Sequence, residues 1–292
     1  MAIWNLGSVN IDHVYHLDRL PHPGETLAAQ RYAQGLGGKG ANQSVAAARA
    51  GAVTRHLGAM GAGDAWVAAR LQDSGVDVSG IARLDDQVTG HAIILLDRDA
   101  ENSIVIHPGA NRAVSEAALS DALAAMTPAD TLLLQNETNG QVAAARAAAV
   151  QGARVIYSAA PFDLDAVRAV MPHVAILAMN EGEAEQLFSG VPGDLPVQGL
   201  LITRGAEGAE YRCLTTGQVF SQPSFKVSPV DTTGAGDTFT GYFAAALDQG
   251  ADIAGALRLA SAAAALKVTR AGTGDAIPTR AEVDAFLAAQ SA

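Results

Sequence analysis

The sequence predicts an α/β fold, with a mostly parallel sheet, helices on both of its faces and a small additional β-sheet. Short apolar runs alternate with Ala-rich stretches of helical periodicity along most of the 292 residues. Strands separated by helices are typical of a parallel sheet that is covered on both faces. Two segments, 10–35 and 88–107, instead alternate apolar and polar residues and predict the extra sheet.

Strand and helix positions follow from the same pattern. The runs at 131–135 and 174–179 are continuously apolar, as strands in the middle of a parallel sheet are. Three Ala-rich helices are expected to end at Gly51, Gly152 and Gly250.

The alternating segments predict a lid. Residues 88–107 have the pattern of a hairpin with its turn at 97–102, and we expect it to pair with strands from 10–35. No low-complexity linker and no repeat divides the chain. We therefore expect one domain over 1–292 with a small sheet standing over a site.

Composition disfavours several classes of function. The formal charge of −11 opposes binding to nucleic acid. No apolar run reaches the roughly 18 residues that span a membrane. Cys213 is the only cysteine, which excludes an intramolecular disulfide, and we expect a cytoplasmic protein. An anionic ligand would need local backbone donors, a helix N-terminus or a metal ion.

The segment Val230–Phe239 carries the strongest chemical signal. It follows the strand-like run FKVSPV and opens an apolar helix. Gly234, Ala235 and Gly236 allow successive backbone N–H groups to face an anion at the helix N-terminus. Asp237 lies beside them, either as a base that takes a proton from a hydroxyl during phosphoryl transfer or as an ordinary helix cap.

The same four letters, Gly-Ala-Gly-Asp, occur at 61–64 before another helix. This copy lacks the preceding acid and the two threonines. We therefore expect Asp64 to act only as a helix cap.

A second glycine-rich segment, Gly35–Gln43, opens another helix. Gly38 permits close approach to the backbone, Lys39 supplies a positive charge, and the Asn42 amide can donate to and accept from hydroxyls. The segment lacks the Gly-Lys-Ser/Thr ending of a Walker A loop. The pattern suits a polyol ligand, and the alternative is an ordinary glycine-rich turn.

Polar residues also follow the expected strands. Asn10 and Asp12 alternate along the chain, so their side chains face one side and either bind hydroxyls or form a turn. Glu137, Asn180 and Glu183 follow apolar strands, at the sheet edge where open α/β folds bind ligands. Glu183 is either a ligand of Mg²⁺ through water or a plain first-turn helix acid.

Together these residues resemble the ribokinase branch of the phosphofructokinase-B-type carbohydrate kinase family. The likeness covers essentially the whole chain and rests on two motifs, GGKGANQ at 37–43 and DTTGAGDTF at 231–239. It implies one Rossmann-like domain with a β-sheet lid that pairs subunits into a homodimer. It also implies ATP-dependent phosphorylation of a small sugar hydroxyl, with D-ribose to ribose 5-phosphate as the expected reaction.

The resemblance implies a role for each matching residue. The expected base and anion-hole donors are Asp237, Gly236, Ala235 and Gly234. The expected sugar-binding residues are Asn10, Asp12, Gly38, Lys39, Asn42, Glu137 and Asp237, under the lid residues Ala92, Ile94 and Ile106. The expected residues around ATP and Mg²⁺ are Asn180, Glu183, Thr203, Gly205, Gly208, Gly236 and Ser261.

Members of this branch are often activated by K⁺. The resemblance implies such a site at Asp231, Thr233, Lys267, Arg270 and Gly272. The chain departs from the family pattern at Ala276, where a serine ligand is usual, and at Ser261, where a larger residue often borders the adenine.

The residues leave other functions open. A kinase for fructose, another ketose or pentose, or a nucleoside would use the same catalytic end, although an aromatic content of 5% disfavours a nucleobase pocket. A non-catalytic sugar sensor is an alternative of another class. A nicotinamide oxidoreductase is disfavoured because the first strand leads into Gly7–Asn10 and not into a three-glycine fingerprint.

Overall fold

The main sheet confirms the predicted α/β fold. The computed structural model describes residues 1–98 and 101–290, and within them this sheet has nine strands. The two strands at one edge are antiparallel to their neighbours, and the remaining pairings are parallel. In sheet order the strands are β13 (Val219–Gln222), β12 (Ala209–Cys213), β11 (Gly199–Thr203), β10 (Ile176–Asn180), β9 (Arg154–Ser158), β8 (Thr131–Gln135), β1 (Ile3–Leu6), β4 (Thr54–Gly61) and β5 (Val76–Leu84).

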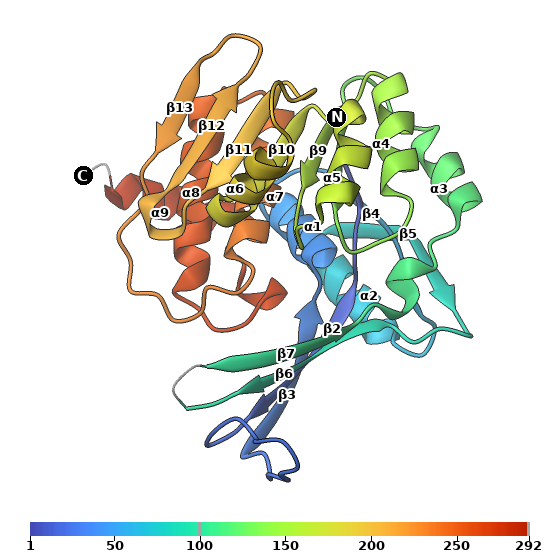
Figure 1. Cartoon of the computed structure of the whole chain (residues 1–292), viewed down its shortest axis with the longest axis vertical. Coiled ribbons are helices and arrows are strands. Elements are labelled where there is room, and N and C mark those ends of the chain that lie inside the picture. Colours follow the sequence, from blue (N-terminus) through green and yellow to red (C-terminus); the bar gives the residue numbers. More distant parts are fainter. Residues whose placement is uncertain (99–100, 291–292) are drawn as a thin grey trace.

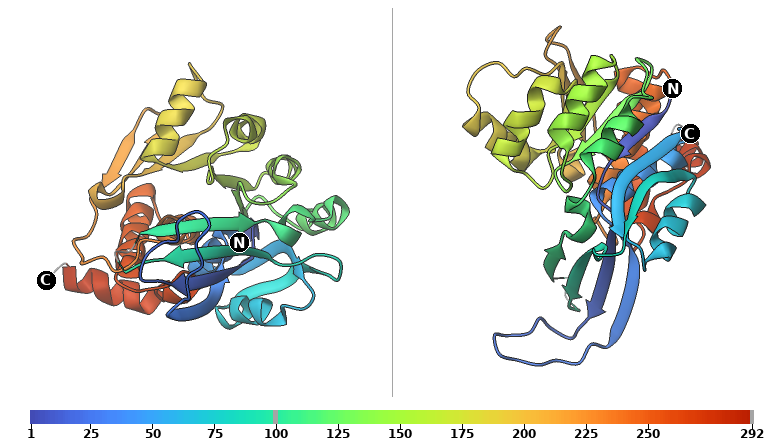
Figure 2. Two further views of the ribbon diagram at one scale, coloured as in Figure 1. Left: turned by 60° about the horizontal axis from the view of Figure 1, so that its bottom comes forward. Right: turned by 90° about the vertical axis from the view of Figure 1, so that its right-hand side faces the viewer.

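Helices cover both faces of this sheet (Figures 1 and 2), and each face has its own apolar core. One core involves α1 (Lys39–Arg49), α2 (Ala65–Asp73), α7 (Ala235–Asp248), α8 (Ile253–Val268) and α9 (Arg280–Gln290). The other involves α3 (Glu116–Leu123), α4 (Gln141–Val150), α5 (Leu164–Val170) and α6 (Glu181–Gly190). Short 3₁₀ turns are η1 (Gly109–Arg112), η2 (Met171–His173), η3 (Gly205–Glu207) and η4 (Gly274–Ala276). No helix in the described part of the chain has the length and apolar character that crossing a bilayer requires.

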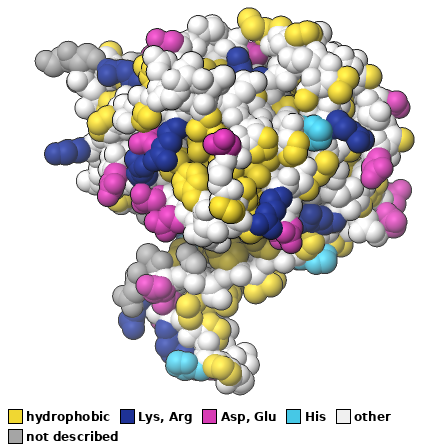
Figure 3. Space-filling view, turned by 45° about the horizontal axis from the view of Figure 1, so that its top comes forward, with side chains coloured by type: hydrophobic (Ala, Val, Ile, Leu, Met, Phe, Trp, Pro, Cys, Tyr) yellow, Lys and Arg dark blue, Asp and Glu magenta, His cyan; other side chains and the backbone are white. Residues whose placement is uncertain are grey.

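A separate four-stranded sheet stands off the main body (Figures 1 and 3). Its order is β3 (Arg31–Gly37), β2 (Asn10–His16), β6 (Gly90–Leu96) and β7 (Asn102–His107). The strands β2, β6 and β7 lie within the two alternating segments, and β3 begins in the first of them and extends to Gly37. Asp12 pairs with Ala92, which pairs with Ile106, so these side chains form one row on one face. The expected turn at 97–102 includes residues 99 and 100, which lie outside the described residues.

Several local predictions can be judged directly. Gly51, Gly152 and Gly250 follow α1, α4 and α7 with φ of 94°, 78° and 85°, which confirms the expected helix ends. The strand predicted at 225–230 is wrong, since β13 ends at Gln222 and no strand follows it before α7. The run 223–230 contains two prolines, whose missing N–H groups cannot join a sheet ladder.

The prediction for Asp64 is also wrong in its detail. Its side chain makes no capping bond to α2. It accepts a hydrogen bond of 2.6 Å from the Thr89 hydroxyl, which in turn accepts from the Gly61 N–H. The second Gly-Ala-Gly-Asp copy therefore ties the β4–α2 loop to the start of β6, a partner that sequence spacing does not reveal.

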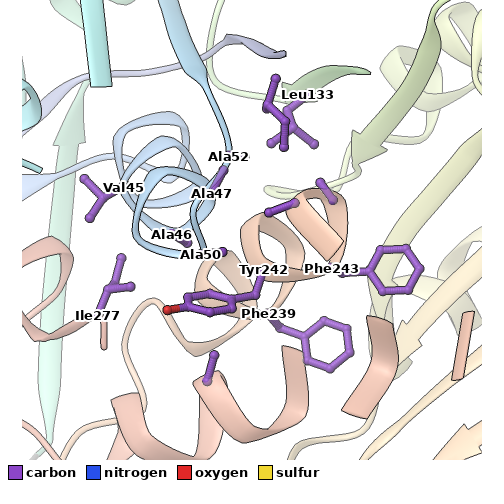
Figure 4. Close-up of a cluster of buried hydrophobic side chains, with 14 of the residues drawn as sticks. Val45, Ala46, Ala47, Ala50, Ala52, Leu133, Phe239, Tyr242, Phe243 and Ile277 are labelled. Carbon is purple, nitrogen blue, oxygen red and sulfur yellow. The ribbon is translucent and has the colours of Figure 1, made fainter. Parts of the chain in front are cut away.

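The helices α1 and α7, which lie far apart in the sequence, pack closely against each other (Figure 4). Ala46 and Ala47 of α1 lie beside Tyr242 and its neighbours on α7. Small residues allow this approach, because a Cβ at Gly241 would lie 2.5 Å from Ala46 Cβ and 2.6 Å from the Gln43 carbonyl oxygen. The Gln43 side chain, described below, therefore depends on the spacing of these helices.

We expect Gly241→Ala to lower the free energy of unfolding by about 1–3 kcal/mol, because overpacking outweighs the gain in helix propensity. The measurement is urea unfolding followed by circular dichroism. Gly63→Ala is the matched control, since a Cβ there meets no atom within 4 Å, and it should change stability by less than about 0.5 kcal/mol. Equal stability of the two variants would contradict the packing argument.

Candidate active site

Asp237 lies in the first turn of α7 and is buried, with 9% of its surface exposed. Asn42 Nδ2 donates to its Oδ2 at 3.0 Å, and Gln43 Nε2 donates to its Oδ1 at 3.1 Å. Hydrogen bonds to a charged group contribute about 1.5–3 kcal/mol each. Two amides of α1 therefore hold the carboxylate, which makes no capping bond to its own helix.

The N-terminus of α7 offers free backbone donors. Gly234, at φ 73°, turns the chain into the helix, a conformation that glycine adopts without strain. The N–H groups of Gly236 and Asp237 have no partner within 1–98 and 101–290. The Ala235 N–H was expected to be an anion-hole donor, but it donates to Thr232 O at 3.2 Å and closes the turn. The anion site thus consists mainly of the Gly236 and Asp237 amides.

A buried polar chain extends behind Asp237. Gln43 Oε1 accepts from Gln135 Nε2 at 2.7 Å, and the same nitrogen donates to Asn5 Oδ1. Asn5 donates to the Ser44 hydroxyl, which lies 2.8 Å from His56 Nδ1. Burial lowers the pKa of His56 to about 4, against the hydrogen bond to the Gly7 carbonyl. A neutral His56 thus donates to the Gly7 carbonyl and accepts from the Ser44 hydroxyl. This determines which group is the donor in each of these hydrogen bonds.

Lys39 and Glu137 meet next to this group. Glu137 Oε2 accepts from the Lys39 backbone N–H at 3.1 Å and from the Ser8 hydroxyl in a short hydrogen bond. Burial alone would lower the pKa of the Lys39 ammonium. The charges of Asp237, Glu137 and Glu183 outweigh that effect, and the pKa of Lys39 is raised. The lysine therefore carries its charge among three carboxylates.

Asn10 and Asp12 project from β2 beside the same region. Asn111 donates to Asn10 Oδ1 at 2.7 Å, and Thr273 lies 3.4 Å from Asp12 Oδ2. Burial raises the pKa of Asp12 to about 6, with the Thr273 hydrogen bond opposing the shift and the charge of Glu137 adding to it. The charge of Glu137 thus acts on Asp12, while Asn10 is held by Asn111.

Two adjoining cavities meet at the start of α7. The smaller, of about 170 Å³, is lined by seven of the expected residues, which are Lys39, Asn180, Glu183, Thr203, Gly234, Gly236 and Asp237. The larger, of about 460 Å³, is lined by Gly205, Gly208, Phe239 and Ser261 among others. Thr203 and Gly236 line both. The Ser261 hydroxyl is buried without a partner in the described chain, which leaves a polar group for a ligand in a largely apolar pocket.

Asn180 and Glu183 form a capping box at the start of α6. Glu183 N–H donates to Asn180 Oδ1 at 2.9 Å, and Asn180 N–H donates to Glu183 Oε2 at 2.8 Å. Burial and the charge of Asp237 raise the pKa of Glu183, against the Asn180 bond and the charge of Lys39. The other Glu183 oxygen has no hydrogen-bond partner among the described residues, and Glu183 lines the smaller cavity. The described residues contain no cluster of three His, Cys, Asp or Glu suited to a metal ion.

The residues expected around K⁺ only partly come together. Lys267 Nζ is fully buried and donates to Asp231 O at 3.0 Å, while the Asp231 carboxylate accepts from the N–H groups of Thr233 and Gly272. Arg270 instead pairs with Glu282 at 2.7 Å on the surface. Neither the Lys267 ammonium nor the Gly272 N–H has a lone pair to offer a cation. These donors bind oxygens of Asp231, a residue of the expected K⁺ site.

Comparison with known proteins decides the family. The sequence pattern of the pfkB family of carbohydrate kinases matches residues 3–280. The chain belongs to this family. As a pfkB kinase it is similar to the ribokinase of Haemophilus influenzae, with 36% identity over 300 residues that cover 97% of each chain.

Solved pfkB-type structures have the same fold. Arabidopsis thaliana ribokinase, complexed with ribose and ATP, is 30% identical with a TM-score of 0.87, covering 98% of this chain and 99% of that one. Burkholderia thailandensis nucleoside kinase, in complex with inosine, is 26% identical with a TM-score of 0.86, covering 99% and 97%.

Sequence reasoning missed several residues that this pfkB kinase places at the site. Gln43 holds Asp237, Asn111 holds Asn10, and Gln135 holds Gln43 in turn. Thr273 lies beside Asp12. Gln43 had a signal, since it closes the GGKGANQ motif. Gln135 and Asn111 had none, because their partners lie 92 and 101 residues away.

We expect Gln43→Met to reduce kcat about tenfold or more, with the KM for sugar changed only a few-fold. The variant removes one of the two bonds that orient the Asp237 carboxylate, a loss of about 1.5–3 kcal/mol. Steady-state ADP release measures the effect. Gln249→Met is the control, because that amide bonds to Ala50 O away from the site. An unchanged kcat in folded Gln43→Met would rule out this positioning role.

Proposed function

We propose that the chain transfers the γ-phosphoryl group of ATP to the 5-hydroxyl of D-ribose. The observation that carries the proposal is the buried carboxylate of Asp237 beside the free N–H groups of α7, where two cavities meet. Similarity to ribokinases over nearly the full length supports ribose as the acceptor. Asn42 Oδ1 is buried and unpartnered within the described residues, which suits a sugar hydroxyl donor.

In this reaction the ribose hydroxyl gives its proton to Asp237 as its oxygen bonds to the γ-phosphorus. The bond from that phosphorus to the bridging oxygen of ADP breaks, and ADP leaves. The Gly236 and Asp237 N–H groups, at the positive end of α7, stabilise the charge on the transferred oxygens. Lys39 adds a fixed positive charge beside them.

The larger cavity suits the nucleoside part of ATP, with Thr203, Gly205, Gly208 and Ser261 along it. The smaller cavity suits the phosphates. Mg²⁺ usually binds through one or two carboxylates, waters and substrate phosphates, so the lone free oxygen of Glu183 fits it without a wider cluster. When bound, Mg²⁺ would neutralise phosphate charge, and Glu183 would orient it.

The four-stranded sheet is proposed as a lid over the sugar within a single kinase domain. Asn10 and Asp12 come from its β2, and Ala92 and Ile106 lie in the same row as Asp12. Ile93 of β6 and Val105 of β7 pair across this sheet and are exposed apolar side chains on one face, which supports a homodimer formed through this sheet. We also propose a cytoplasmic location, where ATP is available.

We expect the chain to release ADP fastest with ribose in a panel of ribose, deoxyribose, fructose and nucleosides. Asp237→Asn should leave ribose binding within a few-fold and lower kcat by about 100-fold or more, since it removes the proton acceptor. A coupled ADP assay with calorimetric ribose titration measures both. Fastest turnover with a nucleoside would overturn the substrate, and near-normal kcat in Asp237→Asn would overturn the base.

A pH profile tests the role of Asp12, whose pKa is raised to about 6. Above that pH the carboxylate accepts hydrogen bonds from ribose, and below it the protonated form loses this capacity. We expect kcat/KM for ribose to fall about tenfold between pH 7 and pH 5 in the wild type. In Asp12→Asn this part of the profile should be flat and low. An identical slope in both proteins would assign the titration to another group.

A further inference from the structure

We infer that the ammonium group of Lys267 is the resident monovalent cation of this kinase, so that phosphoryl transfer needs no K⁺. The inference rests on the proposed phosphoryl transfer and adds a positioning residue to it. Lys267 lies in the last turn of α8, and its side chain is fully buried.

The contacts of Lys267 are those that a small cation would have. Its Nζ lies 3.0 Å from the Asp231 carbonyl oxygen and 4.0 Å from Asp231 Oδ1. Both are oxygen atoms of the residue that begins the DTTGAGDTF motif. An ammonium is a compact charge with three donors, so it satisfies these oxygens without a bound ion.

The surrounding hydrogen bonds occupy the oxygens of Asp231. The two Asp231 carboxylate oxygens accept from Thr233 N and Gly272 N, both at 2.9 Å. The backbone N–H groups of Val230 and Asp231 both donate to Val268 O. The loop thus presents N–H groups toward Asp231, and Ala276 has no side-chain oxygen to offer.

The contact with Asp231 connects Lys267 to the proposed phosphoryl transfer. Asp231 lies four residues before Ala235, where α7 begins, so the contact with Asp231 O anchors the turn that presents the free N–H groups. Burial lowers the pKa of Lys267, and the charges of Asp231 and Asp237 oppose that shift. A buried positive charge here both fixes the turn and favours phosphate at the helix N-terminus.

The test compares turnover with ATP, Mg²⁺ and ribose in K⁺, Na⁺ or tetramethylammonium salts at constant ionic strength. We expect wild-type kcat to agree within about twofold in all three. We expect Lys267→Ala to lose about tenfold in tetramethylammonium and to recover partly with K⁺ or NH₄⁺, because removal of the side chain frees the Asp231 oxygens. Arg168→Met, which removes a surface charge paired with Asp165, is the control and should respond to no cation.

The outcomes separate this inference from the proposed function. Stimulation of the wild type by K⁺ more than about fivefold would overturn the inference and leave the kinase activity standing. A folded Lys267→Ala with wild-type kcat and no cation response would also overturn it, because the lysine would then be structural only. Absence of turnover in every salt would overturn both. The wild-type comparison needs no variant, so it decides even if Lys267→Ala fails to fold.

Discussion

The contact between α1 and α7 is the constraint on which the rest of the site depends. Asn42 and Gln43 reach Asp237 across 195 and 194 residues of sequence. A buried carboxylate needs such partners, because an unpaired charge in the interior is strongly unfavourable. The close approach that Gly241 permits brings these partners within reach. The packing of α1 against α7 therefore also determines the orientation of Asp237.

Local charge at the site opposes the charge of the whole protein. The chain carries a net charge of −11, yet two of its three lysines, Lys39 and Lys267, lie at or directly beneath the start of α7. Nearby carboxylates outweigh burial and raise the pKa of Lys39, whereas burial lowers the pKa of Lys267 against the charges of Asp231 and Asp237. With the free N–H groups of Gly236 and Asp237, the two lysines make an anion-binding region in an acidic protein. This arrangement gives an ATP site that does not rely on the long-range field.

Much of the fold could be read from periodicity, because burial acts on each strand and helix separately. The apolar run at 131–135 is β8, and the alternating segments form the separate sheet. The strand expected at 225–230 does not form, because sheet pairing needs backbone N–H groups and proline has none. The prediction that Asp64 caps a helix was wrong because its hydrogen-bond partner, Thr89, lies 25 residues away. The local sequence pattern thus predicts strands and helices well where burial determines them. It does not predict a contact that depends on a residue far away in the sequence.

The sequence by itself determined the α/β class, the glycine-rich turns before α1 and α7, and the presence of Asp237 beside free amides. These follow from backbone geometry and local periodicity, which neighbouring residues fix. Only the tertiary structure decided that Gln43, Gln135 and Asn5 form a chain behind Asp237, that the Ala235 amide is already used, and that Lys267 reaches Asp231. Those features depend on side chains far apart in sequence meeting in the interior, where each buried polar group must find a partner.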